Sequence, residues 1–275
     1  MPELPEVETT RRGIATIMNG QTLKKFIVHE SRMRWPIPPD LPELVTNQTI
    51  LACERRGKYL LLRFTHGTQL IHLGMSGSLR RVAMDAERLK HDHVEWVFDD
   101  ARFLLHDPRR FGSVLWHATD QGELLQHPLL RNLGVEPFGE AFTPELLYAG
   151  LQKRSIAVKP ALLSGSIVVG VGNIYASEAL FRAGINPMSP ANSLSKARVK
   201  RLHEAIVITL QQALQAGGST LRDYLNATGA PGAYFELHAQ VYDKAGLPCP
   251  RCSHPIKRIV QNQRATYYCS ACQRR

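Results

Sequence analysis

The sequence predicts an α+β protein of two domains, an N-terminal β-sandwich with flanking helices and a C-terminal helical domain that ends in a cysteine-rich ribbon. Short apolar runs rich in branched and aromatic residues dominate the first half, and helical spacing of apolar residues returns in the second. Four of the five cysteines lie at the end of the chain. A length of 275 residues with 44% hydrophobic residues suffices for buried cores.

A helix is expected almost at the start of the chain, from Pro5 to Met18. Val7 and Ile14 recur near helical spacing, Pro5 suits a first turn, and Gly20 suits a helix C-terminus. The first element is therefore a short amphipathic helix.

Strands are expected from about residue 21 to residue 117. The apolar runs there are short and are separated by Gly, Asp and Pro, which is typical of a sandwich or a barrel. The clearest predicted strands are Tyr59–Phe64, Gln69–Leu73, Val94–Phe98 and Arg102–His106.

The second half of the chain is predicted to be helical after Thr143, beyond a Gly- and Pro-rich boundary at Gly134–Pro144. The helical spacing is clearest at Leu202, Ile206, Leu210 and Leu214. Gly217 and Gly218 end this helix.

The charge balance favours a polyanion or an anionic membrane surface as partner, because the formal net charge is +10. No apolar run approaches the roughly 18 residues that cross a bilayer. The N-terminus carries Glu3, Glu6 and Glu8 where a signal peptide is basic and then apolar. We expect a cytoplasmic protein.

The C-terminal cysteines form two C-x2-C pairs, Cys249 with Cys252 and Cys269 with Cys272, with 16 residues between the pairs. This spacing predicts a zinc ribbon with four thiolate ligands. Because protein ligands fill every position, one zinc ion would be structural. Paired disulfides or a redox pair are the alternatives.

The ribbon is also basic. From residue 249 to the C-terminus the chain has no acidic residue, and its basic residues suit contacts with DNA phosphates. These residues are Arg251, Lys257, Arg258, Arg264, Arg274 and Arg275.

Pro2 permits covalent chemistry at the N-terminus, because removal of the initiator methionine would expose a secondary amine. A terminal amine has a pKa of about 8, so part of it is unprotonated and nucleophilic near neutrality. Such an amine can attack C1′ of a deoxyribose, and Glu3 beside it could move protons, with Glu6 one helical turn on. The alternative is that these residues only begin a helix.

Several motifs together closely resemble those of bacterial formamidopyrimidine-DNA glycosylases, in the same order from residue 2 to residue 272. The motifs are Pro2-Glu3-Leu4-Pro5-Glu6, His72-Leu-Gly-Met75-Ser-Gly, Asp107-Pro-Arg109-Arg110-Phe111-Gly112, Gly170-Val-Gly-Asn173-Ile-Tyr175-Ala-Ser-Glu178 and the four-cysteine ribbon. The resemblance implies removal of 8-oxoguanine and formamidopyrimidines from duplex DNA, followed by strand cleavage through β- and δ-elimination.

The resemblance implies that Pro2 is the nucleophile, Glu3 the acid/base residue and Lys58 a second catalytic cation. Without the resemblance, Lys58 would be interpreted as a solvated lysine or a phosphate contact next to a predicted strand. Glu6 is a further active-site candidate.

The damaged base must leave the helical stack before C1′ can be reached, and the space it leaves must be filled. The resemblance assigns this task to Met75, Arg109 and Phe111. Met and Phe can wedge between base steps, and Arg can hydrogen-bond the orphaned base. From the sequence pattern alone, Met75 and Phe111 would be core residues.

The remaining DNA contacts are also implied by the resemblance. Asn173 would begin the second helix of a helix-two-turn-helix motif, where backbone N–H groups meet phosphate; by itself this motif is only a helix cap. The resemblance adds His72, His91, Lys159 and Arg264 as DNA contacts, and Tyr175 and Glu178 as site residues of less defined role. Gly217–Phe235 corresponds to the family's lid over the everted base.

The resemblance divides the chain into a catalytic sandwich domain at 1–134, a helical DNA-binding domain at 135–235 that includes the lid, and a zinc hairpin at 236–275. The expected partner is duplex DNA with oxidised purines or abasic sites, bound by a monomer that is associated with the bacterial nucleoid and not with a membrane. The cofactor is one structural Zn²⁺.

Two alternatives remain. An endonuclease VIII-type glycosylase prefers oxidised pyrimidines, but Leu4 and Arg109 argue against that group. A non-catalytic zinc-ribbon protein that binds DNA would show the same charge, ribbon and helical turn. Only Pro2, Glu3 and Lys58 separate it from an enzyme.

Overall fold

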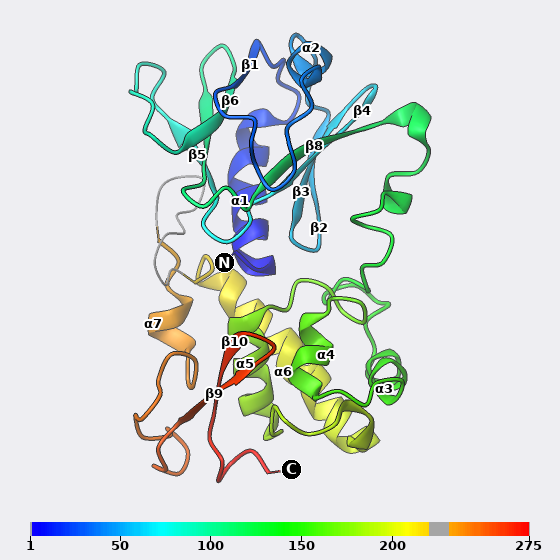
Figure 1. Ribbon diagram of the computed structural model, residues 1–275, viewed down its shortest axis with the longest axis vertical. Helices are drawn as coiled ribbons and strands as arrows, with labels where there is room; N and C mark the ends of the chain where they lie inside the picture. The colour runs from blue at the N-terminus through cyan, green and yellow to red at the C-terminus, as the bar shows by residue number, and fades with distance from the viewer. Residues whose placement is uncertain (1, 220–230, 275) are drawn as a thin grey trace. The chain divides into compact units, whose positions relative to one another are not determined.

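The computed structural model describes residues 2–219 and 231–274, which fall into two compact units (Figure 1). The first unit combines the N-terminal part of the chain, up to Arg131, with Ala216–Phe235. The second combines Asn132–Gln215 with Glu236–Arg275. Much of the predicted lid, residues 220–230, lies outside the described residues, as does Met1.

The first unit begins with helix α1 (Leu4–Met18), one residue longer than predicted. A capping box starts it, in which the Glu6 carboxylate accepts a hydrogen bond from the Glu3 backbone N–H at 2.7 Å. Gly20, with φ +76°, follows the helix as predicted. The first helix is confirmed.

Two antiparallel four-stranded sheets follow, in the strand orders β1-β6-β7-β5 and β2-β3-β4-β8. The strands are β1 (Lys25–Val28), β2 (Ala52–Arg56), β3 (Tyr59–Phe64), β4 (Gly67–His72), β5 (Ser78–Val82), β6 (Asp92–Val97), β7 (Arg102–His106) and β8 (Ser113–Ala118). A short helix, α2 (Leu41–Val45), lies between β1 and β2, and the 3-10 helices η1 (Thr119–Gln121) and η2 (Leu124–Gln126) follow β8.

The two sheets share one core, as a sandwich requires. Leu60, Leu62 and Ile71 of one sheet, Trp96 and Phe103 of the other, belong to a single buried cluster. Helix α1 adds Val7, Ile14 and Met18 to the same cluster. The predicted β-sandwich with flanking helices is confirmed.

The second unit is built on helices. They are α3 (Pro144–Gln152), α4 (Val158–Leu163), α5 (Asn173–Ala183), the 3-10 helix η3 (Ala191–Ser193) and α6 (Lys196–Gln215); α7 (Tyr234–His238) spans the point where the chain returns to this unit. Helix α5 ends at Gly184 in the left-handed conformation, with φ +68°, which is a common helix stop.

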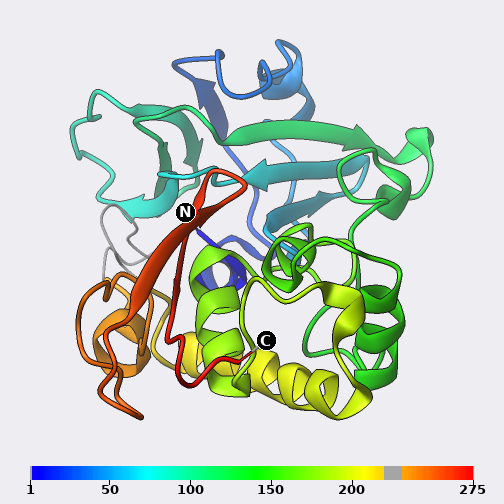
Figure 2. The same ribbon diagram turned by 60° about the horizontal axis from the view of Figure 1, so that its bottom comes forward.

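The C-terminus forms the predicted hairpin, β9 (Lys257–Gln261) paired with β10 (Arg264–Tyr268). Asn262 and Gln263 both have positive φ, as a tight two-residue hairpin turn requires. The hairpin lies beside α5 (Figure 2), and Tyr267 shares a buried cluster with Phe181 of that helix. Among the helices formed by the described residues, none has the length and apolarity to span a bilayer.

Candidate functional site

The N-terminus of α1 holds the predicted nucleophile and acid/base residue. Pro2 is buried, and Glu3 and Glu6 are only 1% and 2% exposed. The second oxygen of the Glu6 carboxylate accepts from the Ser219 backbone N–H at 2.7 Å. Glu6 therefore ties the helix start to the segment that enters the predicted lid.

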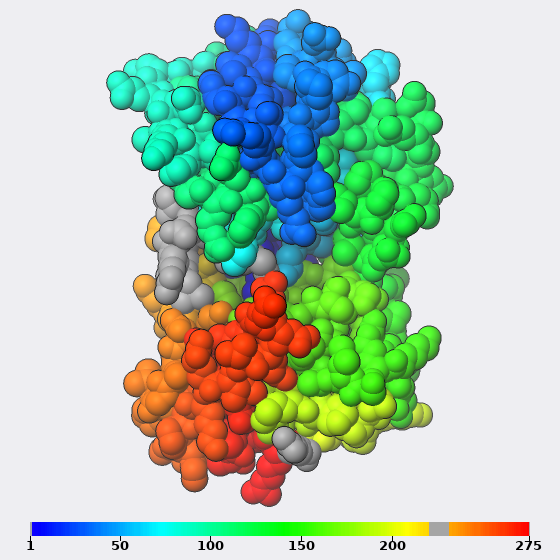
Figure 3. All heavy atoms as spheres, in the orientation of Figure 1, coloured from blue at the N-terminus to red at the C-terminus, as the bar shows by residue number. Residues whose placement is uncertain are grey.

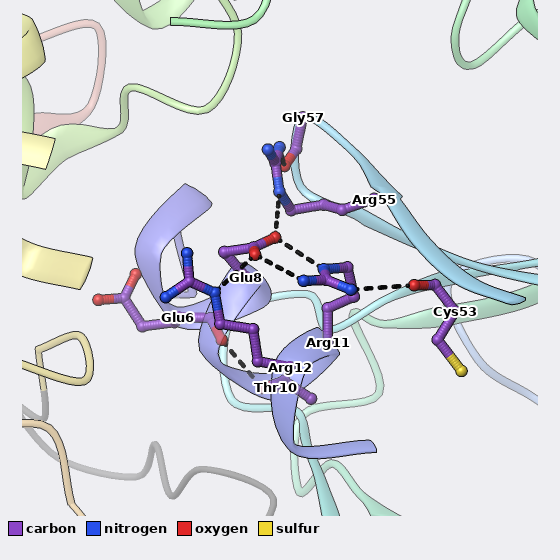
Figure 4. A network of polar contacts seen from close by, with 8 residues as sticks. All are labelled: Glu6, Glu8, Thr10, Arg11, Arg12, Cys53, Arg55 and Gly57. Atoms are coloured by element: carbon purple, nitrogen blue, oxygen red, sulfur yellow. Dashed lines mark hydrogen bonds and ion pairs between the residues drawn. The ribbon is translucent and has the colours of Figure 1, made fainter. Parts of the chain in front are cut away.

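A chain of polar contacts connects α1 to the turn that carries Lys58 (Figure 4). The Glu8 carboxylate accepts from Arg11 and Arg12 of its own helix, each at 2.9 Å, and from Arg55 of β2 at 3.1 Å. Arg55 also donates to the carbonyl of Gly57, the residue before Lys58, at 2.9 Å. The backbone next to Lys58 is thus tied to helix α1.

The Glu8 carboxylate stays ionised at any ordinary pH. Burial alone would raise its pKa, but the hydrogen bonds from Arg11, Arg12 and Arg55 outweigh burial and lower the pKa to about 2. Sequence reasoning named neither Glu8 nor Arg55 as a site residue. The available signal was the spacing of Glu8 with Arg11 and Arg12, which places all three on one helix face.

His72 is the last residue of β4, and its imidazole ring is neutral. Burial, followed by the nearby positive charges of Lys58 and Arg34, lowers its pKa to about 4. Its Nδ1 accepts from the Gly74 backbone N–H at 3.0 Å, so the ring proton is on Nε2. His72 can therefore donate one hydrogen bond to an anion without carrying a charge.

The three predicted wedge residues protrude from two neighbouring loops. Met75 is 37% exposed and Phe111 43% exposed, and the Arg109 guanidinium lies 4.8 Å from the centre of the Phe111 ring. The sequence pattern alone would have placed Met75 and Phe111 in the core. Their exposure leaves both side chains accessible to a binding partner.

In the second unit, two predicted contacts meet at one carbonyl. Asn173, the first residue of α5, donates its amide to the Ala265 carbonyl at 2.9 Å and to the Tyr242 hydroxyl at 3.1 Å. Lys159 of α4 is fully buried and donates to the same carbonyl at 3.0 Å and to Thr266 Oγ1 at 2.8 Å. The exposed Arg264 stands next to this carbonyl, at the start of β10.

Two further candidates of the second unit lie below the surface. Tyr175 is fully buried and Glu178 is 4% exposed. Burial raises the pKa of Glu178, although its carboxylate accepts from the backbone N–H groups of three successive residues, Gln240, Val241 and Tyr242, at 2.8 to 3.0 Å. Glu178 fixes the chain that leads into the zinc ribbon.

The candidates divide between the two units. The first unit holds Pro2, Glu3, Glu6, Lys58, His72, Met75, His91, Arg109 and Phe111, and the second holds Lys159, Asn173, Tyr175, Glu178, Arg264 and the four C-terminal cysteines.

The four ribbon cysteines form a closed thiolate site. Their sulfur atoms all lie within 4.8 Å of one another, with 3.9 Å between Cys249 and Cys272 and 3.4 Å between Cys252 and Cys269. A zinc–sulfur tetrahedron has bonds of about 2.3 Å and therefore edges of about 3.8 Å. The cluster fits one zinc ion, whereas the sulfur atoms are too far apart for the alternative disulfides.

The local backbone supports this site as it does in zinc knuckles. The Arg251 backbone N–H points to the Cys249 sulfur at 3.4 Å, and Gln273 Oε1 accepts from the Cys269 backbone N–H at 2.8 Å. The fifth cysteine, Cys53, belongs to the sandwich core, where burial raises its pKa to about 12. Its thiol is therefore inert at neutral pH.

Models of three protein families match consecutive parts of the chain. The formamidopyrimidine-DNA glycosylase N-terminal domain matches residues 1–114, and the formamidopyrimidine-DNA glycosylase H2TH domain matches residues 133–224. The zinc finger found in FPG and IleRS matches residues 246–275.

Curated relatives match over their full length. The formamidopyrimidine-DNA glycosylase of Bordetella petrii is 61% identical over 275 residues, and that of Burkholderia vietnamiensis is 52% identical over 276 residues, each with 100% of both chains covered.

Solved structures show the same fold. MutM (Fpg) of Thermus thermophilus aligns with a TM-score of 0.89 at 39% identity, covering 99% of this chain and 98% of that one. Lactococcus lactis Fpg in complex with DNA containing an abasic site aligns with a TM-score of 0.92 at 36% identity, covering 99% and 100%. A Lactococcus lactis Fpg mutant in complex with Fapy-dG-containing DNA aligns at 0.91 with 36% identity and full coverage of both chains.

Proposed function

Because the chain belongs to the formamidopyrimidine-DNA glycosylase family, we propose that it excises oxidised purines from duplex DNA and then cleaves the strand at the abasic site. Its substrates are 8-oxoguanine and formamidopyrimidines. The observation that supports this most directly is the start of α1, where Pro2 and Glu3 are buried together and α1 is tied to the Lys58 turn.

The chemistry starts once Met1 has been removed and Pro2 is a secondary amine. The amine attacks C1′ of the damaged nucleotide, the bond from C1′ to the base breaks, and the base leaves with a proton. The bond between C1′ and O4′ then breaks, the sugar ring opens as O4′ takes up a proton, and nitrogen and C1′ are left joined as an iminium ion. Glu3 supplies and takes up protons and stabilises the positive charge that develops on the sugar.

Strand cleavage follows from the iminium ion, which acidifies the hydrogens on C2′. Loss of one of these protons expels the 3′-phosphate by β-elimination, and a second elimination expels the 5′-phosphate. Lys58 is the cation next to these phosphates, held in place through Gly57 and Arg55. Water finally releases the sugar fragment from Pro2.

The phosphate contacts come from both units. His72 donates its Nε2 proton as a neutral ligand, and His91, directly before β6, is a further contact of the sandwich unit. Arg264 gives the zinc hairpin (red in Figure 3) a cation at the surface, and Asn173 supplies the N-terminus of α5. We infer that the buried Lys159 does not contact DNA itself. It donates to the carbonyl of Ala265 and so fixes the backbone next to Arg264.

Met75, Arg109 and Phe111 fill the space left by the everted base. The apolar side chains separate the neighbouring base pairs, and the Arg109 guanidinium hydrogen-bonds the orphaned base. One structural zinc, held by the four ribbon cysteines, keeps the hairpin folded and takes no part in the reaction.

The organisation proposed for the chain is a catalytic domain at 1–134, a DNA-binding domain at 135–235 with its lid, and a zinc hairpin at 236–275. The enzyme acts as a monomer in the cytoplasm, at the nucleoid to which DNA binding holds it. Glu6 and Glu178 support the site without reacting, since backbone N–H groups donate to both carboxylate oxygens of each. Tyr175, buried in α5, is a further supporting residue.

An excision assay with separated steps tests this function. The substrate is a duplex with one 8-oxoguanine opposite cytosine, and free base and cut strand are measured in a single turnover. The protein is expected to release both, and Glu3→Gln is expected to lower base release at least a hundredfold. Binding of the duplex with neither base release nor strand cleavage would instead identify a non-catalytic DNA-binding protein.

A further inference from the structure

The two loops that carry the wedge residues are joined through a buried carboxylate, Asp107, which is fully inaccessible. One of its oxygens accepts from the Ser76 hydroxyl at 2.7 Å, and the other accepts from the Gly112 backbone N–H at 2.8 Å. Ser76 follows Met75 in one loop, and Gly112 follows Phe111 in the other. The carboxylate thus connects the two loops directly behind their exposed side chains.

The serine hydroxyl extends this connection to the third wedge residue. Ser76 Oγ accepts from the backbone N–H of Arg109 at 3.3 Å while it donates to Asp107. Ser76 is itself only 4% exposed, so water does not compete for these bonds. Arg109 is thus part of this network, and Met75 and Phe111 are each one residue away from it.

The main chain of Asp107 reaches a third segment. Its N–H donates to the His91 carbonyl at 2.9 Å, and its carbonyl accepts from His93 Nε2 at 2.8 Å. His91 is itself a proposed DNA contact. Asp107 therefore connects the two wedge-carrying loops to the backbone of His91.

The packing of the two loops leaves no room for adjustment. A Cβ atom at Gly74 would lie 2.4 Å from the Gly112 nitrogen, and one at Gly112 would lie 2.8 Å from the His72 carbonyl oxygen. Arg110, between Arg109 and Phe111, has φ +55°, a conformation that non-glycine residues adopt only where their surroundings impose it. The network around Asp107 supplies that constraint.

We propose that Asp107 and Ser76 are positioning residues for base eversion, which lock the two loops into one rigid wedge. The inference rests on the proposed function. To displace a base from the helical stack, the wedge side chains must keep their positions when they press against the neighbouring base pairs. Side chains on mobile loops would lose the geometry on which the reaction depends. The two residues act through the loops and not on the reacting atoms.

Ser76→Ala is the sharpest variant, because it removes the link between the loops and leaves the bond from Asp107 to Gly112. The matched control is Ser189→Ala, another buried serine, whose hydroxyl has no partner among the described residues. Asp107→Ala removes both side-chain bonds. Asp107→Asn can keep both, with its amide donating to Ser76 and its oxygen accepting from Gly112.

Two duplexes separate eversion from chemistry. One carries 8-oxoguanine opposite cytosine, and the other carries a preformed abasic site, which has no base to unstack. In single turnovers, Ser76→Ala and Asp107→Ala are expected to slow excision of 8-oxoguanine about tenfold or more. Cleavage of the abasic duplex should change less than about twofold, and Asp107→Asn and Ser189→Ala should resemble the parent protein on both.

A double variant tests whether Ser76 acts through the wedge. Met75→Ala removes one wedge side chain, and adding Ser76→Ala to it should slow excision by less than the product of the two single effects. Independent, multiplying effects would overturn the proposal, as would equal losses on the two duplexes, which indicate general damage to the fold. If the parent protein itself excised no 8-oxoguanine, the proposed function would fail instead.

Discussion

The protonation state of His72 follows from its surroundings more than from its sequence. A histidine has an ordinary pKa of about 6.5, but burial and the charges of Lys58 and Arg34 lower the pKa of His72 to about 4. The Gly74 N–H then selects the tautomer. The sequence resemblance pointed to His72 as a DNA contact, but only the fold shows that its imidazole is neutral and has its proton on Nε2.

His72 is therefore expected to remain neutral, with its proton on Nε2, throughout pH 5 to 8. Protonation begins only as the pH falls toward 4. Nitrogen-15 NMR of the histidine side chains would check the tautomer and the titration, and a midpoint near the ordinary value would contradict it. His72→Ala should weaken binding to abasic duplex about tenfold, because a hydrogen bond to a charged group contributes about 1.5–3 kcal/mol.

The lowered pKa of Glu8 makes the stability of the protein depend on pH. Its pKa is lowered to about 2 in the folded protein from an ordinary 4.5, so its contribution is present above pH 4.5 and is lost as the pH falls toward 2. Glu8→Gln should lower the free energy of unfolding by about 1–3 kcal/mol at pH 7. The difference should shrink as the pH is lowered in urea unfolding experiments.

The matched control for Glu8 is Glu43→Gln, since Glu43 is exposed in the first turn of a helix. It should change stability little at any pH. A Glu8→Gln difference that is the same at pH 7 and pH 3 would show that the carboxylate charge contributes nothing.

Lys159 shows where residue-level prediction needs the fold. A lysine in a basic protein suggests a phosphate contact. Lys159 is instead fully buried and donates to the carbonyl of Ala265, which is 106 residues away in the chain. Nothing in the sequence near Lys159 indicates that partner. Its proposed role is to hold Ala265 so that Arg264 meets the DNA.

Lys159→Met should therefore weaken DNA binding through Arg264. The affinity of the variant with both Lys159→Met and Arg264→Ala should equal that of the weaker single variant. Arg264→Ala alone should reduce the slope of log affinity against log salt by about 0.9, the value for one phosphate. Lys153→Met, an exposed lysine, is the control. Effects of Lys159 and Arg264 that simply add would instead favour a separate phosphate contact for Lys159.

At the scale of elements, the zinc ribbon was the most predictable part of the chain, because ligand spacing alone specifies a thiolate tetrahedron. Strands β3 and β7 and helix α6 also follow their sequence signals closely. Helix α2, in a proline-rich stretch, had no such signal. The contact of the hairpin with Phe181 joins distant parts of the chain and could not be predicted locally.

The ribbon should depend on its metal. Cys269→Ser, or removal of zinc by a chelator, is expected to unfold the hairpin, because four-thiolate sites supply folding free energy. Affinity for duplex DNA should fall about tenfold or more, because the unfolded hairpin no longer holds Arg264 in position. Unfolding of the sandwich unit, which has a separate core, should be unchanged in calorimetry. Full DNA binding by the zinc-free protein would contradict this role.

At the scale of the whole molecule, periodicity and composition predicted the order of sandwich, helices and ribbon, and the motifs predicted the chemistry. Neither could predict the supporting contacts, such as Arg55 with Glu8 or Ser76 with Asp107, which join residues 47 and 31 positions apart. Such contacts depend on which strands pair and which loops meet. They determine how rigidly the predicted residues are held.

The attack of Pro2 on the damaged nucleotide is tested most directly by borohydride trapping. The protein is mixed with a duplex that carries 8-oxoguanine opposite cytosine, the iminium ion is reduced, and the linked peptide is identified by mass spectrometry. We expect one DNA adduct, on the nitrogen of Pro2 in chains that have lost Met1. An adduct on Lys58 or another lysine, or base release with no adduct at all, would contradict it.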